Sequence, residues 1–177
     1  YKRFMADILL ENNKVITAHC PNSGSMLTVK PDGATVWVSE AKNPKRKLKY
    51  TWEIIEIDGY NVGVNTSHPN QIVADAIDQQ KIEGIQNYKK LRREVKYGEN
   101  SRIDILLQDD YHPDCYIEVK SVTMKRDDCV PGKVEFPDGI TARGTKHLLE
   151  LSNMVAKGHR AIMFYLVQRY DCNIFSI

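Results

Sequence analysis

Two runs in the second half of the chain, residues 101–107 and 116–122, constrain its fold more than any other feature. Both mix apolar residues with charged ones at spacings of two, the period at which strand side chains return to the same face. The pattern predicts two β-strands. Glu118 and Lys120 share the polar face of the second strand, and Asp104 points away from Ile103 and Ile105 in the first. If the strands are neighbours, two carboxylates and one ammonium meet at one place.

These three side chains predict a metal site that acts on phosphate. Asp104 and Glu118 supply carboxylate oxygens, the hard ligands that Mg²⁺ or Mn²⁺ takes in proteins. An ammonium such as Lys120 can orient an attacking water or stabilise developing charge. Glu94, just upstream, is a candidate fourth catalytic residue. The alternative is an ordinary sheet with surface ion pairs, because Glu-x-Lys occurs by chance in many proteins.

An acid followed by an acid-x-Lys tripeptide on the next strand resembles the pattern of restriction-endonuclease-like enzymes, and Asp104 with residues 118–120 matches it. Arg102 is predicted to share the face of Asp104, where it could bind phosphate or pair with a carboxylate. Lys146 and His147 begin a predicted helix whose amino end could face a phosphate. A solvated first turn is the alternative there.

Short strand patterns fill the first part of the chain and are separated by turn residues such as Asp58-Gly59. Five strands are expected, at residues 4–10, 15–19, 34–39, 50–57 and 60–64. This count indicates a small sandwich or barrel, and a five-stranded oligonucleotide-binding (OB) barrel is one candidate. Trp37 and Trp52 are expected in the barrel core, although tryptophans of such a fold could also stack on bases.

From residue 66 onward the pattern is that of a mixed α/β domain. The expected elements are a helix around 72–77, strands at 92–97, 102–108 and 115–122, a helix at 145–157 and a strand at 161–167. The last strand is almost wholly apolar, which predicts a buried, central position. We therefore predict two domains, an OB-like barrel over residues 1–65 and an α/β domain over residues 66–177.

Positive and negative charges are nearly balanced over the 177 residues, with a formal net charge of +2. Nucleic-acid binding would therefore depend on local clusters, and Lys45, Arg46 and Lys47 form one in the barrel half. A solvated face is the alternative for such a run. No apolar run approaches the ~20 residues that span a bilayer, no secretory signal is visible, and the four cysteines contain no C-x-x-C pair. We expect a cytoplasmic protein that binds DNA and no membrane.

Motifs spread over nearly the whole chain resemble the sugar fermentation stimulation protein A family. They are YKRF (1–4), HCPNSGSM (19–26), KYTWE (49–53), EVKYG (94–98), SRID (101–104), YIEVKSVT (116–123), FPD (136–138) and RGTKHL (143–148). The resemblance implies an amino-terminal OB barrel joined to a restriction-endonuclease-like domain. It also implies DNA binding with little sequence preference and a role in regulating bacterial sugar use.

By motif, the resemblance assigns Asp104, Glu118 and Lys120 to the nuclease-like set, with Glu94 as a fourth member. Family chains usually extend beyond the last strand, so a closing helix is expected to be missing from this sequence. Two hypotheses follow. One is a nuclease that uses Mg²⁺ or Mn²⁺, and the other is a regulator that holds DNA in the same groove without cutting it.

Overall fold

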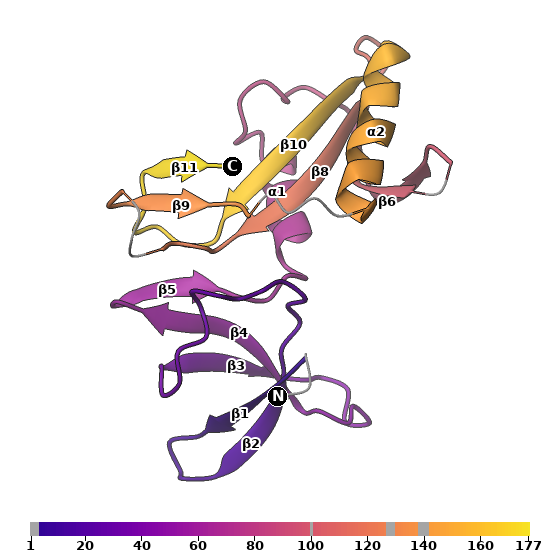
Figure 1. Ribbon diagram of the computed structural model, residues 1–177. Coiled ribbons are helices and arrows are strands. Elements are labelled where there is room, and N and C mark those ends of the chain that lie inside the picture. Colours follow the sequence, from indigo (N-terminus) through magenta and orange to yellow (C-terminus); the bar gives the residue numbers. More distant parts are fainter. Residues whose placement is uncertain (1–3, 100, 127–129, 138–141) are drawn as a thin grey trace. The chain divides into compact units, whose positions relative to one another are not determined.

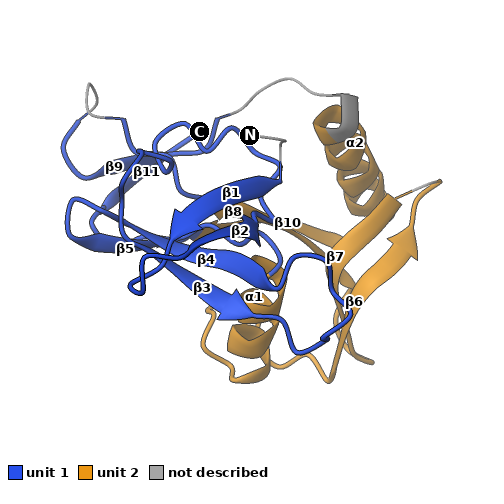
Figure 2. Ribbon diagram, turned by 90° about the horizontal axis from the view of Figure 1, so that it is seen from below, with its two compact units in different colours: residues 1–67, 122–137, 167–177 blue, residues 68–121, 138–166 orange. Residues whose placement is uncertain are grey.

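The computed structural model describes residues 4–99, 101–126, 130–137 and 142–177, so Tyr1, Lys2, Arg3 and Asp138 of the family motifs lie outside the described residues. The chain divides into two compact units, which are coloured separately in Figure 2. The first comprises residues 1–67, 122–137 and 167–177, and the second comprises residues 68–121 and 138–166. Among the described residues, no helix is both long enough and apolar enough to cross a membrane.

The core of the first unit is a five-stranded sheet in which consecutive strands mostly pair antiparallel (Figure 1). Its strands are β1 (Met5–Leu9), β2 (Val15–His19), β3 (Val36–Glu40), β4 (Tyr50–Ile57) and β5 (Tyr60–Gly63). The order is β1-β2-β4-β3, with β5 also paired to β4, and β2 runs parallel to β4. All five strands lie where the sequence predicts them.

Burial of apolar residues holds this sheet together. Trp52, Ile55 and Val62 are buried in one cluster, and the Trp52 indole N–H donates to the carbonyl of Ile54 at 3.0 Å. Trp52 therefore has the core position expected of it. Trp37 does not, because its side chain on β3 is 41% exposed. A β-bulge interrupts the pairing of β3 with β4 immediately after Trp37.

The first unit also contains a parallel pair of short strands, β9 (Lys133–Glu135) and β11 (Ile174–Ser176). The sequence did not predict either strand, because three residues are too few for a period of two to be recognised. Both belong to segments that follow residue 65, the predicted end of the barrel domain. The compact first unit is therefore assembled from three separate stretches of the chain.

The second unit is an α/β unit with a four-stranded sheet in the order β10-β8-β7-β6. Its elements are α1 (Pro69–Asp78), β6 (Lys90–Tyr97), β7 (Ser101–Gln108), β8 (Cys115–Val122), α2 (Ala142–Ala156) and β10 (Arg160–Val167). The prediction of a central position for the last strand is wrong, because within the described residues β10 is an edge strand that pairs only with β8. Residues 161–167 are accordingly half-buried and not fully enclosed.

Two apolar clusters lie on opposite faces of this sheet. On one face, Val73 and Ile77 of α1 pack with Ile105, and on the other, Leu151 of α2 packs with Leu106. Ile105 and Leu106 are adjacent on β7, so their side chains point to opposite faces. Each helix thus covers one face of the sheet, and α2 begins near the strands that carry the charged residues (Figure 1).

The alternation of side chains along β7 reverses at Asp104. Ile103 belongs to the cluster under α2, whereas Ile105 belongs to the cluster under α1. Residues two apart should share a face in a regular strand, so the backbone is irregular between them. Glu94, which lies across from Asp104 on β6, has a φ of 53°, and these two residues are skipped in the pairing. The prediction that Ile103 and Ile105 form a single apolar set opposite Asp104 is therefore wrong.

Candidate metal centre

Asp104 lies where β7, β8 and the start of α1 meet. Its Oδ2 accepts a hydrogen bond from the backbone N–H of Val119 at 2.7 Å, and its Oδ1 accepts one from the Asn70 amide at 2.8 Å. The pairing of β7 with β8 reaches Ile105 opposite Ile117, and the bond from the Val119 N–H places Asp104 against β8 just beyond that pair. The predicted neighbourhood of β7 and β8 is therefore present in the structure.

Burial raises the pKa of Asp104 above its ordinary value. The hydrogen bond from Val119 lowers this pKa, but the negative charges of Glu118 and Glu94 raise it further, and the Asn70 bond lowers it. The balance is upward, so the ionised carboxylate is less stable here than in water. A cation next to Asp104 would reverse that penalty.

Glu118 is almost completely buried, with 4% of its surface exposed. Both of the side chains that contact it approach the same oxygen. Lys120 Nζ lies 2.7 Å from Glu118 Oε1, and His147 Nδ1 lies 2.9 Å from the same atom. The other oxygen, Oε2, is buried and accepts no hydrogen bond from any residue that the structure describes.

The sequence did not predict the contacts that two residues make with this pair. His147 was expected either to face a phosphate or to lie in a solvated first turn, but it lies on the sheet side of α2 and contacts Glu118. Nothing in the residue type of Asn70 predicts a contact with Asp104. The one available signal was that Pro69 begins a helix, which places Asn70 in the first turn.

Further acidic groups surround the pair. Tyr97 is buried, and the pKa of its hydroxyl is raised far above the ordinary value, first by burial and then by the charges of Glu118, Glu150 and Asp104. Glu94 is exposed and contributes through its charge on Asp104. The site is thus rich in acidic groups, and among the described residues Lys120 and His147 are the side chains that contact Glu118.

The residues present fit a hard divalent cation that keeps much of its water. Within the described part of the chain there is no group of three or more His, Cys, Asp or Glu side chains arranged to hold a metal, so a closed protein cage is absent. Mg²⁺ is commonly bound through only one or two carboxylates and retains several waters. Asp104, on which the charge of Glu118 acts, and the buried Oε2 of Glu118 would be the carboxylate oxygens of such a site.

Two of the three predicted nucleic-acid contacts in the first unit are exposed lysines. Lys45 and Lys47 are exposed, whereas Arg46 is held by two partners. One Arg46 nitrogen donates to Thr51 Oγ1 at 2.9 Å and another lies 3.0 Å from His19 Nδ1. The guanidinium is therefore fixed in orientation.

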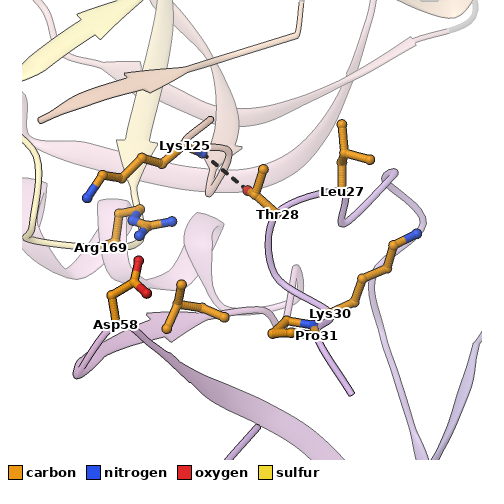
Figure 3. A pocket seen from close by; sticks show the side chains of 8 residues that line it. Leu27, Thr28, Lys30, Pro31, Asp58, Lys125 and Arg169 are labelled. Carbon is orange, nitrogen blue, oxygen red and sulfur yellow. Dashed lines mark hydrogen bonds between the residues drawn. The ribbon is translucent and has the colours of Figure 1, made fainter. Parts of the chain in front are cut away.

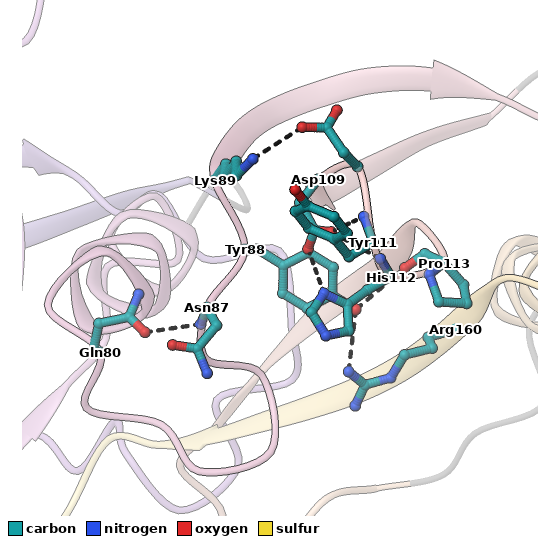
Figure 4. A network of polar contacts seen from close by, with 10 residues as sticks. Gln80, Asn87, Tyr88, Lys89, Asp109, Tyr111, His112, Pro113 and Arg160 are labelled. Atoms are coloured by element: carbon teal, nitrogen blue, oxygen red, sulfur yellow. Dashed lines mark hydrogen bonds and ion pairs between the residues drawn. The ribbon is translucent and has the colours of Figure 1, made fainter.

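The predicted contacts in the second unit have different surroundings. Arg102 is exposed and lies opposite Lys96, and no ion pair of Arg102 is found among the described residues. Lys146 Nζ lies 4.0 Å from Glu150 Oε1, at the limit of an ion pair. Figure 4 shows the surface network around Tyr88, in which Lys89 is engaged by Asp110 at 2.9 Å.

A separate pocket of 420 Å³ lies within the first unit (Figure 3). Its lining includes Lys30, Asp58, Lys125 and Arg169. Asp171 bonds both Lys125, at 2.6 Å, and Arg169, at 2.7 Å, so much of the positive charge at this pocket is already neutralised. The charges at this pocket therefore serve the local structure.

The chain combines an OB barrel with an α/β unit, and the α/β unit carries an acid and an acid-x-Lys motif on adjacent strands. These features define a class, the restriction-endonuclease-like proteins that carry an OB domain. Two family models match in succession, the SfsA N-terminal OB domain at residues 1–64 and the sugar fermentation stimulation protein RE domain at residues 67–177. The chain belongs to the sugar fermentation stimulation protein (SfsA) family. The predicted fold class is thereby confirmed.

Relatives named sugar fermentation stimulation protein homolog are similar over nearly all of this chain. The Rhodospirillum rubrum protein is 57% identical over 97% of this chain and 73% of its own length. The Rhodospirillum centenum protein is 54% identical over 100% of this chain and 75% of its own length. The structure of Pyrococcus furiosus SfsA in complex with Ca²⁺ matches with a TM-score of 0.85, covering 99% of this chain and 72% of that one at 19% identity.

Proposed function

We propose that the protein binds DNA and holds a divalent cation, Mg²⁺ or Mn²⁺, at Asp104 and Glu118, where it cleaves phosphodiester bonds. The observation that carries the proposal is the buried Glu118 Oε2, an oxygen without a hydrogen-bond donor among the described residues, beside the raised pKa of Asp104. A buried carboxylate oxygen without a donor is costly unless a cation or water reaches it. When bound, the cation would supply Lewis acidity to a phosphate oxygen and a more acidic water.

Each residue has a distinct task in this proposal. Asn70 and the Val119 N–H fix the orientation of Asp104. Lys120, whose side chain is 26% exposed, is accessible enough to stabilise charge that develops on the phosphate. Glu94 adds negative potential near Asp104, which favours cation uptake.

The relatives support the choice of a divalent cation and of a cellular role. The Pyrococcus furiosus SfsA structure contains Ca²⁺, and Ca²⁺ takes the same oxygen ligands as Mg²⁺. The names of the bacterial relatives connect the family with sugar fermentation. We infer that this protein acts on DNA in the control of sugar use.

Cleavage is tested with purified protein, supercoiled plasmid, single-stranded and branched DNA, each with Mg²⁺, with Mn²⁺ and with a chelator. Wild type is expected to cut in metal only, and K120M is expected to lose about 10²-fold or more of that rate. D110N is the control, because Asp110 is an acid on the surface of the same unit and pairs with Lys89. A K120M rate equal to that of wild type would refute the assignment.

A regulator that binds DNA without cutting it is the second candidate. It is favoured by the small number of metal ligands, since the described residues form no cluster of three. Absence of cleavage on every DNA form, with DNA affinity retained by K120M, would establish this function instead.

DNA binding itself is tested by fluorescence anisotropy over a salt series. The double variant K45A/K47A should weaken binding and reduce the slope of log K against log salt by about 2, because each phosphate contact contributes roughly one. Lys14 and Lys30 are exposed lysines of the same unit, so K14A/K30A is the control with an equal change of charge. Equal slopes for the two double variants would remove Lys45 and Lys47 from the contact surface.

A further inference from the structure

The two hydrogen bonds at Glu118 Oε1 limit how this carboxylate can bind a cation. A carboxylate oxygen has two lone-pair positions. Lys120 Nζ at 2.7 Å and His147 Nδ1 at 2.9 Å occupy both of those on Oε1. Because an ionised carboxylate accepts but does not donate, the His147 nitrogen is the donor in its contact. Only Oε2 is left for a metal, and it is buried and without a donor among the described residues.

Coordination through one oxygen favours some divalent ions over others. Mg²⁺ and ions of similar size form compact octahedral sites with single carboxylate oxygens and water. Ca²⁺ takes six to eight oxygens and readily accepts both oxygens of one carboxylate. A glutamate with only one free oxygen therefore cannot offer Ca²⁺ its second carboxylate oxygen. A smaller ion does not need that oxygen.

We propose that His147 is a positioning residue that sets metal selectivity: by capping Glu118 Oε1 it makes this ligand monodentate and so disfavours Ca²⁺ relative to Mn²⁺ or Mg²⁺. The inference rests on the proposed metal site at Asp104 and Glu118. The position of His147 on α2 suits this role, because its side chain is only 15% exposed and lies between the helix and the sheet. Lys120 also contacts Oε1, but it lies on β8 together with Glu118. His147 is therefore the contact to Oε1 that comes from α2.

The experiment compares Mn²⁺ and Ca²⁺ affinities of each variant by calorimetry, without DNA. H147L removes the donor, and the ratio of the Ca²⁺ to the Mn²⁺ dissociation constant should fall about tenfold, the order expected when a group behind a ligand is removed. H147N should keep the wild-type ratio, since the asparagine amide nitrogen stands at the same number of bonds from Cβ as Nδ1. His112 contacts Asp109 in the same unit, so H112L serves as the control histidine.

The ratio is measured within one variant, so a partly unfolded sample changes both affinities alike and leaves the ratio unaltered. If H147L does not fold, H147S removes the ring donor in its place. A ratio within about twofold of wild type in the leucine or serine variant, or an equal loss in H147N, overturns the role of His147. Binding of neither ion by wild type refutes the metal site itself, and this inference with it.

Discussion

Replacing Asp104 by asparagine should raise the free energy of unfolding of the metal-free protein at pH 7, although it removes a proposed metal ligand. Burial and the charges of Glu118 and Glu94 raise the pKa of Asp104, so its ionised form penalises the folded state. Asparagine is neutral and avoids that penalty. Its carbonyl can still accept from the Val119 N–H, and the Asn70 amide can turn to present its oxygen.

Alanine at the same position separates charge from hydrogen bonding. D104A leaves the Val119 N–H and the Asn70 amide without the acceptor they share. An unsatisfied buried donor costs about 1–3 kcal/mol. D104A should therefore be less stable than D104N by about that amount, although both variants lose the same charge. The free energies come from urea or guanidinium unfolding monitored by circular dichroism.

The pH dependence of the difference between D104N and wild type provides an internal check. For an acid whose folded pKa is raised, the protonated form favours folding, and this contribution is lost as pH rises through the folded pKa. The advantage of D104N should be largest at neutral pH and should shrink as pH falls toward the ordinary pKa of aspartate, about 4. A D104N that is less stable than wild type at pH 7, or that equals D104A, would contradict the reasoning.

Two further variants test the structure away from the metal site. Asp171→Ala should lower the free energy of unfolding by about 3 kcal/mol, because it leaves the Arg169 side chain, which is 1% exposed, as a buried charge without this carboxylate. The pKa of Asp171 is lowered well below its ordinary value. In chemical unfolding, the stability difference between this variant and wild type should therefore fade as pH drops below about 4. Gly98→Ala should cost about 1 kcal/mol more than Gly158→Ala in thermal unfolding. Both glycines have positive φ, but only a Cβ on Gly98 would meet a side chain, that of Glu150, at 2.7 Å. Equal melting temperatures for the two alanine variants would count against that contact.

The strands of both units were largely predictable because their pattern is local. The five strands of the first unit lie within two residues of their expected starts and ends. The acid-x-Lys tripeptide lies on β8 as expected, since a period of two depends only on neighbouring residues. By contrast, β9 and β11 are stabilised by pairing between residues about 40 apart, and no local pattern marks them.

The sequence by itself determined the candidate site residues: Asp104, Glu118 and Lys120 follow from residue type and spacing within two strands. Only the tertiary structure decided which groups contact them. It reverses the alternation of β7 at Asp104, adds Asn70 from α1 and closes Glu118 Oε1 with His147 from α2. Spacing along a strand fixes the face on which a side chain lies, but the partner of each oxygen depends on helices that are distant in sequence and are positioned by packing against both faces of the sheet.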